Sequence, residues 1–191
     1  MPRHNVRQQL IDAGLKVLIE KGFNGSGVQD ITAAAGVPKG SFYNHFESKE
    51  ALGAEIVDIY GRDNPRRAIL ADKSLPPLQR LQAHFERLNA VFTDADFGRG
   101  CLLGNFSAEL SGQSELIRER LANLYLNWSS DVAAVIAEAQ VDGSISTKAP
   151  AQELAAFLLD AYEGALLRAR VEKNGRAFDR FMTVAFTQIL I

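Results

Sequence analysis

A short segment near the N-terminus concentrates side chains that can bind nucleic acid. Lysine, tyrosine and serine side chains hydrogen-bond phosphate oxygens, whereas asparagine, serine and lysine also hydrogen-bond the edges of bases. The segment carries these groups at Lys39, Ser41, Tyr43, Asn44, His45 and Lys49. The residue types therefore indicate chemistry of non-covalent recognition rather than catalysis.

Two short helices joined by a tight turn would position these side chains. Ser26 and Gln29 have the spacing of a capping box, which predicts a helix that starts at Val28. Gly36 suits the end of that helix because glycine tolerates positive φ, and Pro38 suits the start of the next helix, expected over 39–46. An amphipathic pattern over 6–21 predicts a preceding helix. Such a capped hairpin also occurs in all-α proteins that bind no DNA, but the density of donors on the second helix favours DNA binding.

The same segment resembles the DNA-binding domain of the TetR family of bacterial transcriptional regulators. The resemblance covers about the first sixty residues and rests on Asp30-Ile31, Ala35-Gly36-Val37, Lys39-Gly40-Ser41-Phe42-Tyr43, Phe46 and Ser48-Lys49-Glu50-Ala51-Leu52. It implies an all-α fold of about nine helices. A three-helix helix-turn-helix domain would occupy 1–48, and a helical domain for effector binding and dimerisation would occupy 49–191.

The resemblance also implies a set of contacts with double-stranded operator DNA. Lys49 and Tyr43 would hold phosphates, and Gly40 would allow close approach. The full expected set is Ser26, Gln29, Lys39, Gly40, Ser41, Phe42, Tyr43, Asn44, His45 and Lys49. Packing is the alternative for the aromatic residues: we expect Phe46 in the core, and Phe42 is open between packing and apolar contact with DNA.

The N-terminal end adds a further open alternative. Arg3, His4 and Arg7 could lie over a phosphate or in a minor groove. A solvated chain end is the favoured interpretation of the same residues.

Composition sets limits on function. The 191 residues are 47% hydrophobic and 23% charged with a formal net charge of −2, which is typical of a globular protein. Because basic and acidic residues nearly balance, DNA affinity must come from a few placed contacts and from two copies that bind together. No apolar run is long enough to span a membrane and no signal peptide precedes the first helix, so we expect a cytoplasmic protein without a membrane partner.

The sequence favours neither an enzyme nor a metalloprotein. The histidines are His4, His45 and His84, and they form no metal-binding spacing. No nucleophile elbow, phosphate loop or dinucleotide fingerprint is present. The single cysteine, Cys101, excludes an intrachain disulfide and a cysteine zinc site. We therefore predict no catalytic residues, no cofactor and no metal.

The remaining chain reads as further helices over 49–71, 78–93, 101–110, 114–140, 149–173 and 175–190. Pro65 is expected to kink or end the first of these near Asn64. The last two, over about 149–190, could form a core hairpin or pair with a second copy as a homodimer, and the resemblance favours the homodimer. We also expect the helix from Leu52 to Ala71 to act as the lever between effector pocket and DNA.

Aromatic and apolar residues of these helices are candidates for the pocket of a small-molecule effector of unknown identity. The candidates are Phe85, Leu88, Phe92, Cys101, Phe106, Tyr125, Trp128, Phe157 and Tyr162. Core packing is the favoured interpretation for any one of them. Tyr125, Trp128 and Tyr162 are the stronger candidates, because each has a polar atom that needs a partner.

Cys101 is also a candidate redox sensor. It follows Arg99 at an expected helix N-terminus, and both features lower the pKa of a thiol. The surrounding Gly100-Cys101-Leu102 and Ser107-Ala108-Glu109 resemble, over a short stretch, a branch of the family that responds to electrophiles or oxidants. A buried cysteine that packs as a small hydrophobe is the alternative.

The sequence therefore predicts a dimeric DNA-binding regulator, and a repressor in particular. A small molecule, or modification of Cys101, would release it from its operator. Two alternatives are open: an interaction protein with the same fold that binds no specific DNA, and a transcriptional activator.

Overall fold

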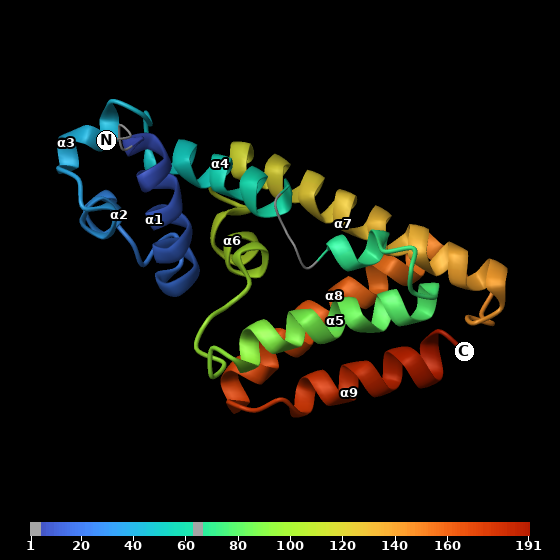
Figure 1. The fold of residues 1–191 in the computed structure, drawn as a ribbon. Helices are drawn as coiled ribbons and strands as arrows, with labels where there is room; N and C mark the ends of the chain where they lie inside the picture. The colour runs from blue at the N-terminus through green and yellow to red at the C-terminus, as the bar shows by residue number, and fades with distance from the viewer. Residues whose placement is uncertain (1–4, 63–66) are drawn as a thin grey trace. The chain divides into compact units, whose positions relative to one another are not determined.

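The computed structural model describes residues 5–62 and 67–191, and in these ranges it contains helices and connecting segments but no β-strand. The helices are α1 (Val6–Lys21), α2 (Val28–Ala35), α3 (Lys39–Tyr43), α4 (Lys49–Arg62), α5 (Pro77–Thr93), α6 (Leu102–Leu110), α7 (Glu115–Asp142), α8 (Ala151–Glu172) and α9 (Arg176–Val184) (Figure 1). A 3-10 turn covers Ala68–Ala71, and a π-helical turn, Ala185–Ile189, follows α9. The all-α prediction is confirmed. The expectations for Arg3, His4, Asn64 and Pro65 lie outside the described residues.

The chain forms two compact units. The first unit combines Met1–Asp63 with Cys101–Leu124, and the second combines Asn64–Gly100 with Tyr125–Ile191. The first unit therefore holds α1 to α4, α6 and the first part of α7. The helix-turn-helix therefore packs with helices that lie beyond residue 48, namely α4, α6 and the start of α7. The division at residue 48 into a DNA-binding and an effector-binding domain stays a prediction.

Apolar residues from several helices form the core of the first unit. Leu10, Ile31, Leu52 and Ile56 are fully buried. Polar contacts then fix α4: Arg7 of α1 pairs with Glu55 at 2.5 Å, and Arg120 of α7 pairs with Asp58 at 2.9 Å. These contacts join α4 to both α1 and the start of α7.

The N-terminus of α7 makes one more connection to α4. The Ser114 hydroxyl accepts a hydrogen bond from the backbone amide of Ile117 at 3.1 Å and thereby caps α7. The same hydroxyl donates a hydrogen bond to the carboxylate of Glu50. Ser114 is 6% exposed, so this small network is shielded from water. The expected start of this helix at Ser114 is confirmed as its cap.

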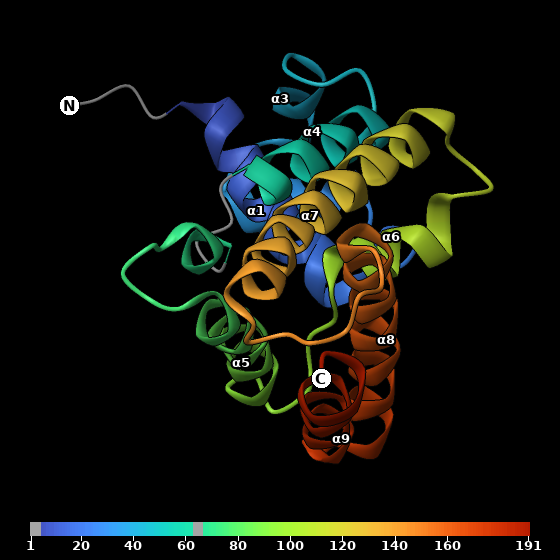
Figure 2. The ribbon, with the colours of Figure 1, turned by 90° about the vertical axis from the view of Figure 1, so that its right-hand side faces the viewer.

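An aromatic core fills the second unit. The ring of Phe85 lies 5.4 Å from that of Tyr162 and 4.9 Å from that of Phe181, between ring centroids. The indole of Trp128 donates to Nε2 of His84 at 3.0 Å within the same core. Figure 2 shows α8 and α9 side by side, and these two helices pack on each other.

Candidate nucleic-acid interface

The helix before the turn, α2, starts from a different cap than the sequence indicated. Gly27 is the N-cap residue, and the Asp30 carboxylate accepts its amide at 2.7 Å. The Ser26 hydroxyl instead donates to the Gly22 carbonyl at 2.9 Å, and Ser26 is 6% exposed. The predicted Ser26–Gln29 capping box is therefore wrong, because Gly27 and Asp30 form the cap, although the predicted start of the helix at Val28 is confirmed. The sequence signal for the real cap is an aspartate three residues after a glycine.

Asp30 also pairs with Lys21, the last residue of α1, at 2.6 Å. This hydrogen bond, together with the Gly27 amide, holds the pKa of the Asp30 carboxyl below its usual range. The negative carboxylate lies in the first turn of α2, where the helix dipole favours negative charge. Asp30 thus links the end of α1 to the start of α2.

The turn between α2 and α3 has helix-turn-helix geometry. Gly36 is left-handed at φ 68°, and the Val37 amide donates to the Thr32 carbonyl at 3.0 Å. Pro38 is the N-cap residue of α3. The structure therefore confirms the expected role of Gly36, whereas Pro38 precedes the first residue of α3 instead of occupying that position.

The recognition helix α3 is shorter than expected over 39–46. It ends at Tyr43, and the amides of His45 and Phe46 donate to the Phe42 carbonyl at 3.0 Å each. Asparagine and histidine have low helix propensity, which favours this early end. Asn44 and His45 therefore lie in a turn that follows α3.

Most of the predicted DNA contacts of α3 are accessible. Ser41 is half-buried, and Tyr43 is 57% exposed. A Cβ built on Gly40 would meet no atom within 4 Å, so the backbone is open there. The exposed residues are Gln29, Lys39, Gly40, Tyr43, Asn44 and His45. This surface presents donors and acceptors together on one short segment.

The expectation that Phe42 contacts DNA is wrong. Phe42 is fully buried, and its ring lies 5.7 Å from that of Phe46 and 5.3 Å from that of Tyr43. A buried ring offers no apolar contact to a base. Phe46, which is 5% exposed, lies in the core as expected, with the guanidinium carbon of Arg7 5.0 Å from its ring centroid.

Lys49 is engaged within the first unit. Its ammonium donates to the carbonyls of Phe23 at 2.7 Å and Ser26 at 2.6 Å, and it lies 4.1 Å from the centroid of the Phe23 ring. Partial burial lowers the pKa of Lys49, while the charges of Glu109 and Asp30 oppose that shift. In this conformation the ammonium braces the turn between α1 and α2 rather than facing outward to a phosphate.

The structure separates the candidate pocket residues into different places. Phe106 packs in the first unit, where its ring meets that of Phe23 edge-on at 5.7 Å. Cys101 is the N-cap residue of α6 and is 7% exposed. The buried candidates of the second unit are Phe85, Leu88, Phe92, Trp128 and Tyr162, all within its core. The favoured interpretation of these five as core residues agrees with their burial.

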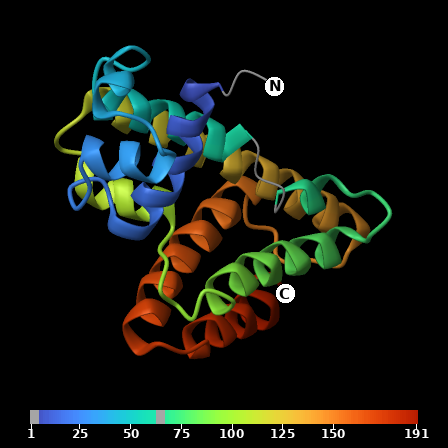
Figure 3. The ribbon, with the colours of Figure 1, turned by 60° about the vertical axis from the view of Figure 1, so that its left-hand side comes forward.

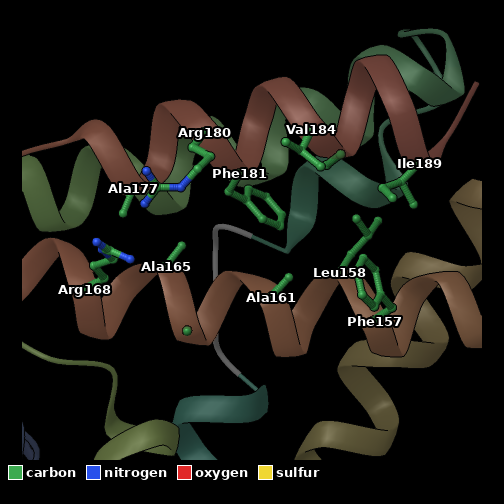
Figure 4. Close-up of a pocket in the computed structure, with 12 residues that line it drawn as sticks. Phe157, Leu158, Ala161, Ala165, Arg168, Ala177, Arg180, Phe181, Val184 and Ile189 are labelled. Atoms are coloured by element: carbon green, nitrogen blue, oxygen red, sulfur yellow. The ribbon is translucent and has the colours of Figure 1, made fainter.

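Two hollows on the second unit contain the remaining candidates. One of about 330 Å³ lies between α8 and α9 and includes Phe157 (Figure 4). The other, of about 530 Å³, lies between α7 and α8 and includes Tyr125. Figure 4 shows Arg168 and Arg180, from the two facing helices, at one end of the first hollow.

The helical periodicity did not identify this hollow, because small residues rather than aromatic ones line much of it. Ala161, Gly164 and Ala165 recur on one face of α8, and this spacing is the signal that could have found it. Among residues 5–62 and 67–191, no cluster of histidine, cysteine, aspartate and glutamate could hold a metal ion. No helix in those ranges is long and apolar enough to span a membrane.

A glycine-terminated helix, a tight turn and a short helix with exposed donors define a helix-turn-helix, the site of a DNA-binding transcriptional regulator. Residues 10–56 match the family model of bacterial regulatory proteins of the tetR family, and residues 77–185 match the tetracyclin repressor-like C-terminal domain. The chain belongs to the TetR family.

Similar proteins agree with this assignment over nearly the whole chain. The HTH-type transcriptional repressor DhaR of Mycobacterium sp. strain GP1 is 45% identical, over 100% of this chain and 95% of that protein. The transcriptional regulator AcuR of Cereibacter sphaeroides is 37% identical, over 86% of this chain and 76% of its own. The crystal structure of a regulatory protein TetR from Rhodobacter sphaeroides has a TM-score of 0.89 and 34% identity, and covers 96% of this chain and 98% of its own.

Proposed function

We propose that this chain is a homodimeric, cytoplasmic repressor that binds operator DNA through α3 and is released by a small-molecule effector. The observation that carries the proposal is the exposed set of hydrogen-bonding groups on α3 and the turn after it. The name of DhaR, a transcriptional repressor, supports repression over activation. The proposal assigns the chain no catalytic reaction and no cofactor.

The exposed side chains divide by the part of the DNA they would contact. Lys39, Ser41, Asn44 and His45 would face the major groove, because lysine, serine and asparagine pair with base edges. Tyr43 and the exposed Gln29 would contact phosphates, and Gly40 would let the backbone approach the DNA closely. Ser26 and Phe42 leave the proposed set because they are buried.

The proposed dimer uses the outer face of α8 and α9. Phe157 is 51% exposed on α8 and Val184 is 36% exposed on α9, and both line the hollow between these helices. An apolar face of this kind on two packed helices supports a four-helix interface with a second copy. Two recognition helices would then be separated by about 34–36 Å, one turn of DNA.

The test is a gel shift with DNA that flanks the gene of this chain. We expect saturable binding by the wild type, which Lys39→Met weakens and Asn44→Ala redirects toward other sequences. Asn127→Ala, which changes an exposed asparagine of α7, is the matched control and should bind like the wild type. If the wild type neither binds this DNA nor enriches any sequence from a random duplex library, the proposal is wrong.

A second candidate for release is covalent modification of Cys101. The position of Cys101 as N-cap of α6 supports it, because backbone amides at a helix N-terminus stabilise thiolate. With N-ethylmaleimide, the sulfur would bond one alkene carbon and a proton would be added to the other. Loss of DNA binding in the wild type but not in Cys101→Ser would support this route. If treatment reduces DNA binding equally in both proteins, or in neither, Cys101 has only a packing role.

A further inference from the structure

Two charged side chains hold the turn between α1 and α2 from different helices. Glu109, near the end of α6, accepts the Asn24 amide at 2.6 Å through Oε2. Lys49, the first residue of α4, donates to the carbonyls of Phe23 and Ser26. In this turn, residues 22–26, a backbone amide therefore donates a hydrogen bond to a carboxylate, and two backbone carbonyls accept hydrogen bonds from an ammonium. Figure 3 shows α6, in yellow-green, beside the blue α1 and α2.

Gly22 makes the contact with Glu109 possible. Its φ is +75°, and a Cβ built on it would overlap Oε1 of Glu109. The carboxylate thus lies directly against the backbone, at the point where α1 ends. A residue with a side chain at this position would both strain the backbone and displace the carboxylate.

The Phe23 ring completes the attachment of the turn. It packs edge-on against Phe106 of α6, and a Cβ on Gly53 of α4 would lie 3.1 Å from its Cε2 atom. The Lys49 ammonium lies over the same ring. Both α4 and α6 therefore contact the turn through one charged group and one apolar surface.

We propose that Glu109 and Lys49 are positioning residues for operator binding: together they fix the turn between α1 and α2, and through α2 they orient the recognition helix. The turn leads directly into Gly27, the N-cap residue of α2, and α2 packs on α3. Lys49 acts through this turn and is not a phosphate ligand. The inference rests on the operator binding proposed above, and it gives α6 a direct hold on the DNA-binding segment.

The two roles of Lys49 predict different salt dependences. A lysine that neutralises a phosphate contributes about 0.9 to the slope of log affinity against log salt concentration, whereas a positioning residue contributes nothing to that slope. Positioning instead affects operator DNA more than random DNA, because base contacts require an accurate orientation whereas backbone contacts tolerate small shifts.

The first experiment measures binding to a duplex that the wild type has enriched from a random library, over a series of salt concentrations. We expect Lys49→Met and Glu109→Leu each to weaken binding by about tenfold, the loss typical of a charge-assisted hydrogen bond, with the wild-type salt slope. Binding to a scrambled duplex should change by less than about twofold. Glu109→Gln keeps an oxygen acceptor for the Asn24 amide and should restore most of the affinity.

Matched variants separate this inference from the proposed DNA contacts. Lys16→Met and Glu119→Gln remove exposed charges of the same unit and should leave affinity unchanged. Lys39→Met should weaken binding and change the preference among DNA sequences, as expected of a base contact. A slope that falls by about 0.9 in Lys49→Met would make Lys49 a phosphate ligand and overturn the proposal. If only Lys39→Met fails to behave as expected, the proposed contacts are wrong and the positioning role stands.

A second experiment needs no DNA. Hydrogen exchange of the free protein should show faster exchange of the backbone amides in 22–27 and 39–46 in Glu109→Leu, with exchange in α8 unchanged.

A third experiment measures the operator affinity of the double variant Lys49→Met/Glu109→Leu. Its loss of affinity should be smaller than the product of the two single losses, because both residues hold one turn. Unchanged exchange in the turn, or losses that multiply, would overturn the proposal.

Discussion

Adjacent aromatic residues of α3 have opposite environments. Phe42 is fully buried, whereas Tyr43 is 57% exposed, and the two rings form a T-shaped pair. The buried ring anchors the recognition helix to the first unit, while the exposed phenol is available to bind a phosphate. Stability and DNA binding should therefore separate cleanly at these two positions.

The first prediction compares variants at these positions. Phe42→Ala should lower the free energy of unfolding by about 3–5 kcal/mol, because it empties a fully buried site. Tyr43→Phe should change that free energy by less than about 0.5 kcal/mol and weaken binding to operator DNA. Urea unfolding and fluorescence anisotropy measure the two effects. Similar stability losses in both variants would contradict this division.

The second prediction concerns the pH dependence of Asp30. Its folded pKa lies below the ordinary value of 3.8, so its contribution to stability is present above that value and is lost as pH falls through the folded pKa. The difference in melting temperature between the wild type and Asp30→Asn should be constant near neutral pH and should shrink below about pH 4. Asp12→Asn, on the exposed side of α1, controls for the loss of one charge. A difference that persists at low pH would show that Asp30 does not contribute as a carboxylate.

At the scale of elements, proline and glycine signals located several helix ends, including the end of α2 and the start of α5. The predicted helix over 6–21 matches α1, and the predicted helix over 78–93 starts one residue later than α5. The end of α3 was missed because a helix of five residues is too short for periodicity to fix its boundaries or the orientation of Phe42. The site residue Glu109 was missed because its partner Asn24 is 85 residues away in sequence. Such contacts depend on tertiary packing, which local patterns do not encode.

The third prediction belongs to the start of α7. Ser114→Ala removes the cap of this helix together with the hydrogen bond to Glu50, so the free energy of unfolding should fall by about 1–2 kcal/mol. Ser130→Ala, which changes an exposed serine inside α7, should cost less than about 0.5 kcal/mol. Chemical denaturation measures both. Equal effects would mean that the cap contributes nothing.

At the scale of the whole molecule, the outer face of α8 and α9 connects the fold to the proposed dimer. The hollow between these helices combines apolar residues with Arg168 and Arg180 (Figure 4). A two-fold interface buries the same patch on both copies, so a single substitution there changes the interface twice. DNA binding by two linked recognition helices would then depend on protein concentration.

The fourth prediction follows from this symmetry. Phe157→Glu should leave the unfolding of the monomer nearly unchanged, because the side chain is half exposed, but should weaken self-association by at least about tenfold. Sedimentation equilibrium measures the association, and operator affinity should fall with it. Val141→Glu, at a residue that is 90% exposed on α7, is the control. If Phe157→Glu still dimerises like the wild type, the dimer interface does not include this face of α8 and α9.

The first unit is discontinuous in sequence, and this has a consequence for protein engineering. Its helices come from Met1–Asp63 and from Cys101–Leu124. A chimera that exchanges only the N-terminal segment with a relative would place a foreign turn against Glu109 and Phe106. Specificity grafts between members of this family should therefore transfer residues 101–124 together with the recognition helix, so that the graft carries its own support.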